Sequence, residues 1–542
     1  MIATLREWRV GSRAADDAQV SSKPWWLDLG TVVPLLAGLT YLVVLVVRLV
    51  GSLSSFYWYS DFPEALRLGD AMFSGGYGQG LSVPSQTGIG PLWAVGLLDQ
   101  VTRSDIAGMA FGALMVGLAI GLMVLTAYKV MGRASAVAVA VLSLAAPPVV
   151  AWEMLTPIAH ESTLLLSAIG VWQLVSLSRP SRGHALVSHV LVGALAGVCV
   201  ASDSLAIPAA VAPWIVCAIV LARRNPSRRR PLIVTAGAAV ATVALVEFLS
   251  RTSGIAQQGN VGLAPSIAGV TSGLRTTATT LGQMISGAWY SAAIPTVLVV
   301  LGFVSFVALI YMATRVLRRH VTADVPGREL YVWYWLLSCA GLIAAFCLSG
   351  LGRQLSPVNY QGHYVDGLWF VTAAVLPLGF LWIGGFRRRL LVACVASLAV
   401  ASAVGVATMP QDLFNGPDYV DSARLTTSLE QLGVARGYGG YWESYAVGWH
   451  TDDRITTLPL QQCASGLCRY EFAARAWYRR QPGPVFVIVQ AAPCASDNLC
   501  IDAANLERFP SPESVRDVGL LRIYVYADDV FAGLPTASPP VA

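Results

Sequence analysis

The chain has 542 residues, of which 55% are hydrophobic and only 12% are charged, and its mean hydropathy is +0.60. This number of charges is too small to cover the surface of a soluble globule of this size. The composition therefore excludes a soluble protein and predicts an all-α polytopic membrane protein. The formal net charge of +5 comes from arginines beside apolar runs rather than from a basic stripe with interleaved aromatics, so we expect no nucleic-acid partner.

Long apolar runs predict the membrane-spanning helices, because a helix needs roughly 20 apolar residues to cross ~30 Å of hydrocarbon. About eleven runs meet that length, at 29–50, 105–129, 134–152, 157–177, 185–202, 204–222, 231–250, 288–314, 331–350, 366–384 and 389–408. The fifth and sixth form one apolar stretch. We divide it at Asp203 because a single span would place Arg182 and Arg223 on opposite sides of the membrane. Asp203 is therefore expected to be a turn residue.

Basic residues lie before the first run and in every second segment between runs. They are Arg6, Arg9, Arg13 and Lys23, then Lys129 and Arg133, Arg179 and Arg182, Arg223 to Arg230, Arg315 to Arg319, and Arg387 to Arg389. Loops rich in Lys and Arg stay in the cytoplasm. We therefore expect a multi-pass protein of the cell membrane, with residues 1–28 inside and the segment after Thr408 outside. No small-residue cleavage site follows the first run, which we interpret as a signal anchor.

The predicted topology places three polar loops of the transmembrane domain, residues 29–408, on the outer side: 51–104, 251–287 and 351–365. Within the first loop, apolar residues alternate with charges from Asp61 to Ser74, which predicts an amphipathic helix along the outer surface. Gly88 to Leu98 predicts a second short helix.

The last segment, 409–542, changes character, because charges become frequent and apolar residues occur in short runs punctuated by Pro and Gly. A helix is predicted at Asp418 to Leu432, and buried strands at Pro484 to Val489 and Leu521 to Tyr526. We therefore expect a small extracytoplasmic α/β domain. The aromatic residues from Tyr438 to Trp449 suit either a sugar-stacking platform or the core of this domain. Their spacing resembles one face of a half-buried strand, which favours the core.

Cysteines divide between the apolar spans and the C-terminal segment. The four in the C-terminal segment are Cys463, Cys468, Cys494 and Cys500. Four cysteines outside the cell allow three disulfide connectivities, of which Cys463 with Cys468 and Cys494 with Cys500 close the shortest loops. A zinc site is the alternative, but these spacings fit common zinc motifs poorly and no histidine is close.

Asp61 has two interpretations. With Glu64 three residues later and Pro63 between them, Asp61 forms a capping box for the predicted helix. It also lies just beyond the first span, where a carboxylate can deprotonate an acceptor hydroxyl while a lipid-linked donor stays in the bilayer.

The order of elements resembles the GT-C glycosyltransferase superfamily: a first span, an outer loop with an acid near its start, a surface helix, many further spans and a soluble outer domain. Ile158-Ala159-His160-Glu161 resembles the polar residues that these enzymes present to their cavity. Gly352-Arg353-Gln354-Leu355-Ser356-Pro357 resembles a bacterial Arg-Tyr-Leu-x-Pro pattern, with Gln354 in place of the tyrosine. The resemblance implies polyprenyl-phosphate sugars as donors, inversion at the sugar, and Asp61 as general base or metal ligand.

Candidate residues for such a reaction all fall on the predicted outer side. The proposed base is Asp61, with Glu64 as a second carboxylate. The leaving phosphate would be bound by Arg353, with His363 close behind it, or by Arg275. Arg353 has a second interpretation, because an arginine just outside a span also snorkels to the headgroups. Trp58, Tyr59, His160 and Glu161 are candidates for lining the substrate cavity.

The sequence thus predicts transfer of a monosaccharide from a polyprenyl-phosphate donor to an envelope glycan, lipid or protein. A carrier or flippase for lipid-linked sugars, or an inactive scaffold with the same fold, is the alternative. Mg²⁺ or Mn²⁺ is a candidate cofactor, because Asp61 and Glu64 offer the oxygen ligands that these ions prefer.

Overall fold

The computed structural model describes most of the chain. Its described residues are 32–33, 36–45, 47, 61–73, 81–84, 89–102, 105–148, 150–151, 160–179, 186–258, 266–286, 296–320, 327–349, 365–381, 386–408, 422–451, 454–463, 466–470, 473, 475–480, 482–494 and 499–536.

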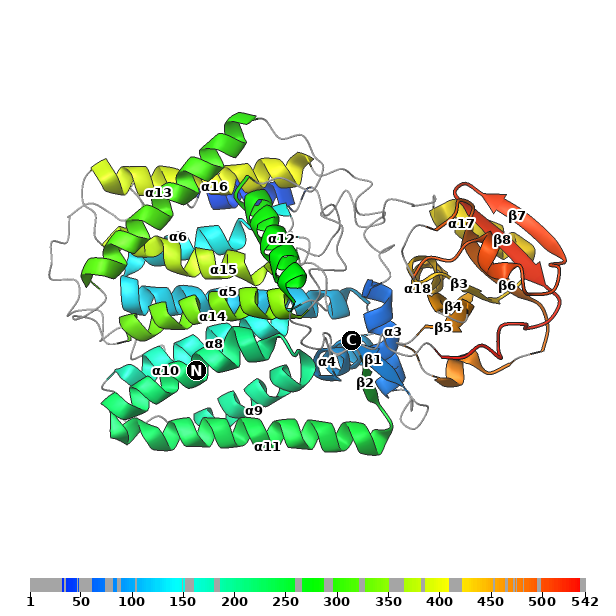
Figure 1. Cartoon of the computed structure of the whole chain (residues 1–542), viewed down its shortest axis with the longest axis horizontal. Helices are drawn as coiled ribbons and strands as arrows, with labels where there is room; N and C mark the ends of the chain where they lie inside the picture. The colour runs from blue at the N-terminus through cyan, green and yellow to red at the C-terminus, as the bar shows by residue number, and fades with distance from the viewer. Residues whose placement is uncertain are drawn as a thin grey trace.

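Most of the described chain folds into one bundle of apolar helices (Figure 1). They are α5 (Asp105–Met131), α6 (Arg133–Leu144), α8 (Glu161–Ser178), α9 (Leu186–Ser202), α10 (Ala212–Arg224), α11 (Arg229–Ser253), α12 (Ile267–Ser286), α13 (Thr296–His320), α14 (Arg328–Leu348), α15 (Gly367–Val375) and α16 (Phe386–Thr408). A π-helical turn, Ile207–Val211, leads into α10, and a 3-10 turn, Leu376–Leu381, follows α15. Most of these helices run side by side, whereas α12 and α13 cross them.

Several helices have the length and composition of membrane spans. Among the described residues, five are long and apolar enough: Phe111–Met131, Ile207–Arg224, Pro226–Ser253, Arg328–Leu348 and Arg389–Thr408. Shorter apolar helices accompany them. Helix α11 exposes Ile233, Val240 and Phe248 by 62% or more, an apolar surface that suits lipid and not water. The structure therefore supports a multi-pass membrane protein, and the number of about eleven crossings stays a prediction.

The bundle core is packed with aromatic side chains whose polar atoms meet backbone carbonyls. The Trp369 indole nitrogen donates to the Leu142 carbonyl at 2.8 Å, and the Tyr331 hydroxyl donates to the Ala374 carbonyl at 3.0 Å. Both side chains are less than 3% exposed. In a span without water, such pairing removes the cost of burying a polar group.

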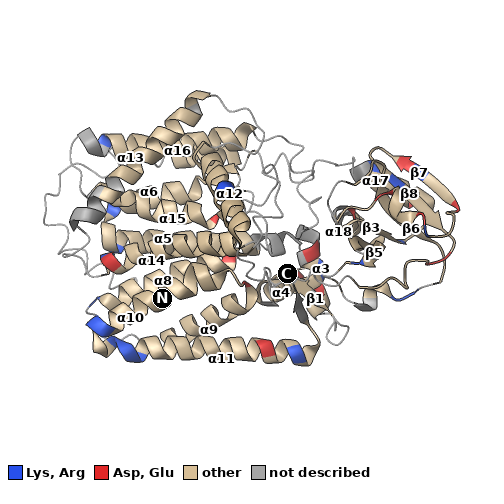
Figure 2. Cartoon of the chain, in the orientation of Figure 1, with Lys and Arg blue, Asp and Glu red and all other residues tan. Residues whose placement is uncertain are grey.

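The arginine-rich segments meet at one end of the bundle (Figure 2). Arg228 donates to the Arg179 carbonyl at 2.8 Å, Arg328 donates to the Val130 carbonyl at 3.0 Å, and the Arg224 guanidinium pairs with the Glu329 carboxylate. These segments were predicted to share one side of the membrane, and the described ones do lie together.

Two of the predicted outer loops contain regular structure and touch each other. Helices α3 (Asp61–Phe73) and α4 (Ile89–Thr102) confirm the two predicted helices of loop 51–104. Strand β1 (Ser82–Pro84) pairs in parallel with β2 (Ala256–Gln258) from loop 251–287. The same loop carries the 20-residue helix α12. The sequence did not predict α12, because its many Thr, Ser and Gly residues lower its hydropathy below that of a span.

The C-terminal α/β unit, residues 422–536, is built on a six-stranded sheet of order β5-β4-β3-β6-β8-β7. Its strands are β3 (Arg436–Gly439), β4 (Thr456–Cys463), β5 (Gly466–Arg469), β6 (Val485–Gln490), β7 (Ser514–Val518) and β8 (Leu521–Tyr526), with helices α17 (Ser422–Leu432) and α18 (Tyr441–His450). Strand β3 is parallel to β4 and β6, and the other pairs are antiparallel. Helix α17 and strands β6 and β8 lie where they were predicted.

The aromatic segment after β3 is a helix, so the predicted strand is wrong. Parallel neighbours need a crossover connection, and α18 supplies it between β3 and β4. The preference for a core role is correct for the described side chains: Tyr441, Tyr445 and Val447 are each 3% exposed or less. Tyr441 and Tyr445 are four residues apart, so they share a helix face as readily as a strand face.

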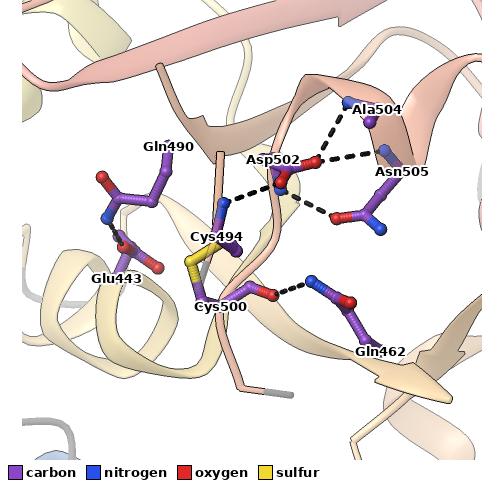
Figure 3. Close-up of a disulfide and its surroundings, with 8 residues drawn as sticks. All are labelled: Glu443, Gln462, Gln490, Cys494, Cys500, Asp502, Ala504 and Asn505. Carbon is purple, nitrogen blue, oxygen red and sulfur yellow. Dashed lines mark hydrogen bonds between the residues drawn. A yellow bond between two sulfur atoms is a disulfide. The ribbon is translucent and has the colours of Figure 1, made fainter. Parts of the chain in front are cut away.

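Both favoured disulfides are present. Cys463 pairs with Cys468 across the β4–β5 hairpin, and Cys494 pairs with Cys500 in the segment after β6. Figure 3 shows the second disulfide among hydrogen bonds that hold its flanks: the Cys494 amide donates to the Asp502 carboxylate at 2.8 Å, and the Gln462 side chain donates to the Cys500 carbonyl at 2.9 Å.

Candidate functional site

A mainly apolar cavity with several polar side chains opens at the end of the bundle opposite the arginine-rich segments. Glu161 begins α8 and Arg179 follows its last residue, so the length of one helix separates them. The cavity has a volume of about 60 Å³. Its polar lining consists of His160, Glu161, Thr163, Ser167, Ser338 and Asp366, and its apolar lining includes Trp335, Leu342, Phe370 and Val371. Polar groups converging in an apolar, concave site are typical of a ligand-binding pocket.

His160 is held in the cavity wall by Asp203. Its Nδ1 lies 2.9 Å from the Asp203 carboxylate, which is 1% exposed. The Thr163 hydroxyl donates to the same carboxylate, and the Leu205 amide donates to its other oxygen at 2.9 Å. Asp203 is therefore the predicted turn residue and also the partner of a cavity histidine 43 positions away.

Two further carboxylates line the cavity from different helices. Glu161 is 7% exposed at the start of α8, and Asp366 is 6% exposed just before α15. Burying a carboxylate within a membrane bundle is costly, so such residues mark functional sites more often than structural ones. The cavity thus gathers acidic and hydroxyl groups suited to the hydroxyls of a sugar.

The first-loop helices are attached beside this cavity by close backbone contacts. A Cβ on Gly96 of α4 would lie 2.4 Å from the Gly69 carbonyl of α3, so the two helices cross at van der Waals distance. The Gly90 amide at the start of α4 donates to the Ser202 hydroxyl at 3.2 Å. Because Ser202 precedes Asp203, helix α3 is linked through α4 to the cavity wall.

The structure places the remaining predicted residues as follows. Asp61 is the first residue of α3. Glu64 is 3% exposed, and its carboxylate accepts a hydrogen bond from the Tyr441 hydroxyl at 2.8 Å. Arg275 is exposed on α12 and does not line the cavity. Trp58, Tyr59, Arg353 and His363 lie outside the described residues.

Sequence reasoning found His160 and Glu161 and placed Asp366 in a polar site beside Arg353, but it missed the role of Asp203. Asp203 resembled an ordinary turn residue. The signal for its role was present, because an acidic residue between two long apolar runs is costly to bury. No group of three His, Cys, Asp or Glu side chains able to hold a metal ion occurs among the residues that the structure describes.

Comparisons with known proteins find a similar fold among solved structures. No protein-family model matches the chain, and no curated protein matches its sequence. Among solved structures, the chain is similar to ArnT from Cupriavidus metallidurans bound to undecaprenyl phosphate, with a TM-score of 0.51 and 12% identity over 91% of this chain and 99% of that chain. The apo state of the same protein matches with a TM-score of 0.50 and 12% identity, over the same shares of both chains.

At this identity the likeness shows the fold, which extends through the bundle and into the C-terminal unit because it covers nearly the whole of both chains. The chain therefore has the fold of ArnT over nearly its whole length, and the resemblance that the order of elements predicted is confirmed at the level of the fold.

Proposed function

We propose that the protein is a membrane glycosyltransferase that moves one monosaccharide from a polyprenyl-phosphate donor to a cell-envelope acceptor on the outer face of the membrane. The observation that carries the proposal is the cavity in which His160, Glu161 and Asp366 meet within a mainly apolar lining, at the same end of the bundle as helix α3, which begins at Asp61. ArnT, whose fold the chain shares, has been seen bound to undecaprenyl phosphate, and this supports a polyprenyl carrier here.

In the proposed reaction, the acceptor oxygen attacks the anomeric carbon of the donor sugar while the bond from that carbon to the phosphate oxygen breaks. The electron pair of the broken bond stays on the polyprenyl phosphate. Asp61 takes the proton of the acceptor hydroxyl, and the attack from the opposite face inverts the anomeric centre. Arg353 binds the leaving phosphate, because a guanidinium keeps its charge and its forked donors match phosphate oxygens.

His160 and Glu161 orient the sugar in this proposal. A histidine ring held on Nδ1 by Asp203 has a defined direction, and a carboxylate such as Glu161 accepts hydrogen bonds from sugar hydroxyls. Fixed groups of this kind contribute to rate by holding reactants in a near-attack arrangement.

The proposed orientation agrees with the clustering of basic residues. Arg179, Arg224, Arg228 and Arg328 gather at the bundle end away from the cavity. With that end in the cytoplasm, the cavity and the C-terminal unit face outward, where envelope acceptors are found and disulfides persist.

The first prediction concerns the base and the phosphate ligand. Asp61→Asn and Arg353→Ala should each lower sugar transfer by at least about 100-fold, because they remove the proton acceptor and the charge that stabilises the leaving group. The measurement is transfer from a radiolabelled polyprenyl-phosphate sugar in membranes, normalised to folded protein. Arg275→Ala tests the alternative phosphate ligand, and because Arg275 is exposed and does not line the cavity, it should lower transfer much less than Arg353→Ala.

Unchanged transfer by Asp61→Asn would remove the proposed base. Movement of the labelled lipid across the membrane without any transfer would support a flippase instead. Repeating the assay with EDTA, and then with Mg²⁺ or Mn²⁺ restored, tests whether a divalent cation assists Asp61 and Glu64.

A further inference from the structure

Helix α3 lies between two parts of the molecule: the bundle, to which α4 links it, and the C-terminal unit (Figure 1). Glu64, one turn after Asp61, accepts a hydrogen bond at 2.8 Å from the hydroxyl of Tyr441, the first residue of α18. The two residues are 377 positions apart, and both are 3% exposed. A charge-assisted hydrogen bond between buried partners is a strong and directional contact.

A second contact lies one turn further along α3. The Arg67 guanidinium sits over the Trp477 ring at 5.1 Å, and its Nη1 approaches the Thr457 carbonyl at 3.4 Å. Trp477 also packs against the apolar cluster formed by α3, β1, α4 and the segment before β2, which contains Leu68, Ala71, Met72, Leu81, Val83, Leu92 and Ile255. The C-terminal unit therefore binds α3 by an apolar contact flanked by two polar ones.

The Tyr441 hydroxyl is presented from a rigid frame. The backbone amide of Tyr441 donates to the Leu499 carbonyl at 2.9 Å. Leu499 lies inside the loop that the Cys494–Cys500 disulfide closes. Around that disulfide, Asp502 and Gln462 hold the two ends of the loop (Figure 3). The Tyr441 ring is packed against Tyr470, with ring centroids 4.9 Å apart.

The neighbouring Tyr445 belongs to the same contact. Burial, followed by the charge of Glu64, raises the pKa of Tyr445 well above its ordinary value. Glu64 therefore interacts with two tyrosines of the C-terminal unit, and it is not among the described residues that line the cavity. Its position suits a structural anchor better than a base that must meet an acceptor hydroxyl.

We propose that the C-terminal unit sets the position of α3, and that Glu64 and Tyr441 are positioning residues for Asp61. This inference rests on the proposed function. Asp61 begins the helix that Glu64 anchors, so a shift of α3 moves the proposed base relative to the sugar. A displacement of about 1 Å at a reacting group can cost about 100-fold in rate.

The test is Tyr441→Phe, which removes one hydroxyl and keeps the ring packing. Its kcat should fall at least about tenfold with little change in KM for the donor, because the cavity stays intact while the base is displaced. Tyr438→Phe is the matched control: its hydroxyl also binds a carboxylate, Asp529, at 2.9 and 3.0 Å in the same unit. Equal kcat values for the two variants would overturn the proposal.

Two substitutions at Glu64 separate positioning from catalysis. Glu64→Gln keeps an oxygen that accepts from Tyr441, so its kcat should fall less than that of Glu64→Ala, which should resemble Tyr441→Phe. A Glu64→Gln variant as inactive as Asp61→Asn would show that Glu64 takes part in chemistry, and the positioning role would be wrong.

Hydrogen exchange tests the contact without any activity. Tyr441→Phe should raise amide exchange in residues 61–73, and Tyr438→Phe should not. The double variant Cys494→Ser/Cys500→Ser should raise it as well, more than Cys463→Ser/Cys468→Ser, because only the first disulfide closes the loop that binds Tyr441. Unchanged amide exchange of α3 in Tyr441→Phe would reject the anchor, whatever that variant does to sugar transfer. Full transfer by Asp61→Asn together with increased α3 exchange in Tyr441→Phe would reject only the proposed base.

Discussion

Two acidic residues, Asp203 and Glu64, each have a local role that the neighbouring sequence predicts and a contact with a distant residue that it does not. Asp203 follows the serine that ends α9 and accepts the Leu205 amide, as a turn aspartate does. Its second role, binding His160 across 43 positions, depends on how α8 and α9 are placed. Glu64 likewise belongs to a capping-box motif in sequence but is bound by Tyr441 in the fold. In both residues the local pattern was present and the partner came from a distant segment.

The two roles of Asp203 can be separated by substitution. Asp203→Asn keeps an oxygen for the Leu205 amide but loses the charge that pairs with His160. We expect little change in thermal stability and about a tenfold loss of transfer. Asp203→Ala should lose both contacts and destabilise the protein by about 1–3 kcal/mol. Thermal unfolding in detergent and the transfer assay measure these effects. Full activity in Asp203→Asn would reduce Asp203 to a turn residue.

At the scale of elements, helices with a clear apolar pattern were predictable and those shaped by their neighbours were not. Helices α3 and α4 and the strands β6 and β8 lie where the periodicity placed them. Helix α18 was predicted as a strand because its aromatic spacing suits both periods, and only the parallel pairing of β3 with β4 demands a crossover helix. Helix α12 was missed because its polar composition did not resemble a span.

The crossing of α3 and α4 gives an element-scale prediction. Gly96→Ala would place a methyl group 2.4 Å from the Gly69 backbone, so the helices must separate, at a cost of about 1–3 kcal/mol. We expect a lower unfolding temperature and faster exchange in residues 61–73. The control is Gly121→Ala in α5, where no atom lies within 4 Å of the added Cβ. Equal stability of the two variants would contradict close packing at this crossing.

At the scale of the whole molecule, the described charged residues of the bundle lie mostly near its two ends (Figure 2). The arginine-rich segments meet at one end, and the cavity carboxylates Glu161 and Asp366 lie at the other, next to the first-loop helices. The C-terminal unit is joined to that second end through α3. The two ends therefore differ: one gathers the arginine-rich segments, and the other combines the candidate site with the folded C-terminal unit.

The proposed orientation is tested with single cysteines in intact cells. Ser227→Cys in the arginine-rich segment should resist a membrane-impermeant thiol reagent, and Ser511→Cys in the C-terminal unit should react, since both serines are exposed in the structure. Permeabilised cells provide the control, in which both variants should react. Labelling of Ser227→Cys in intact cells would reverse the predicted topology.

The sequence by itself determined the membrane class, the alternation of basic segments and the positions of most helices, because hydrophobic length and charge act locally along the chain. Only the tertiary structure decided that Asp203 holds His160, that α18 is a helix and that Tyr441 binds Glu64. Each of those outcomes depends on a partner distant in sequence, and buried polar groups must find such partners when the helices pack.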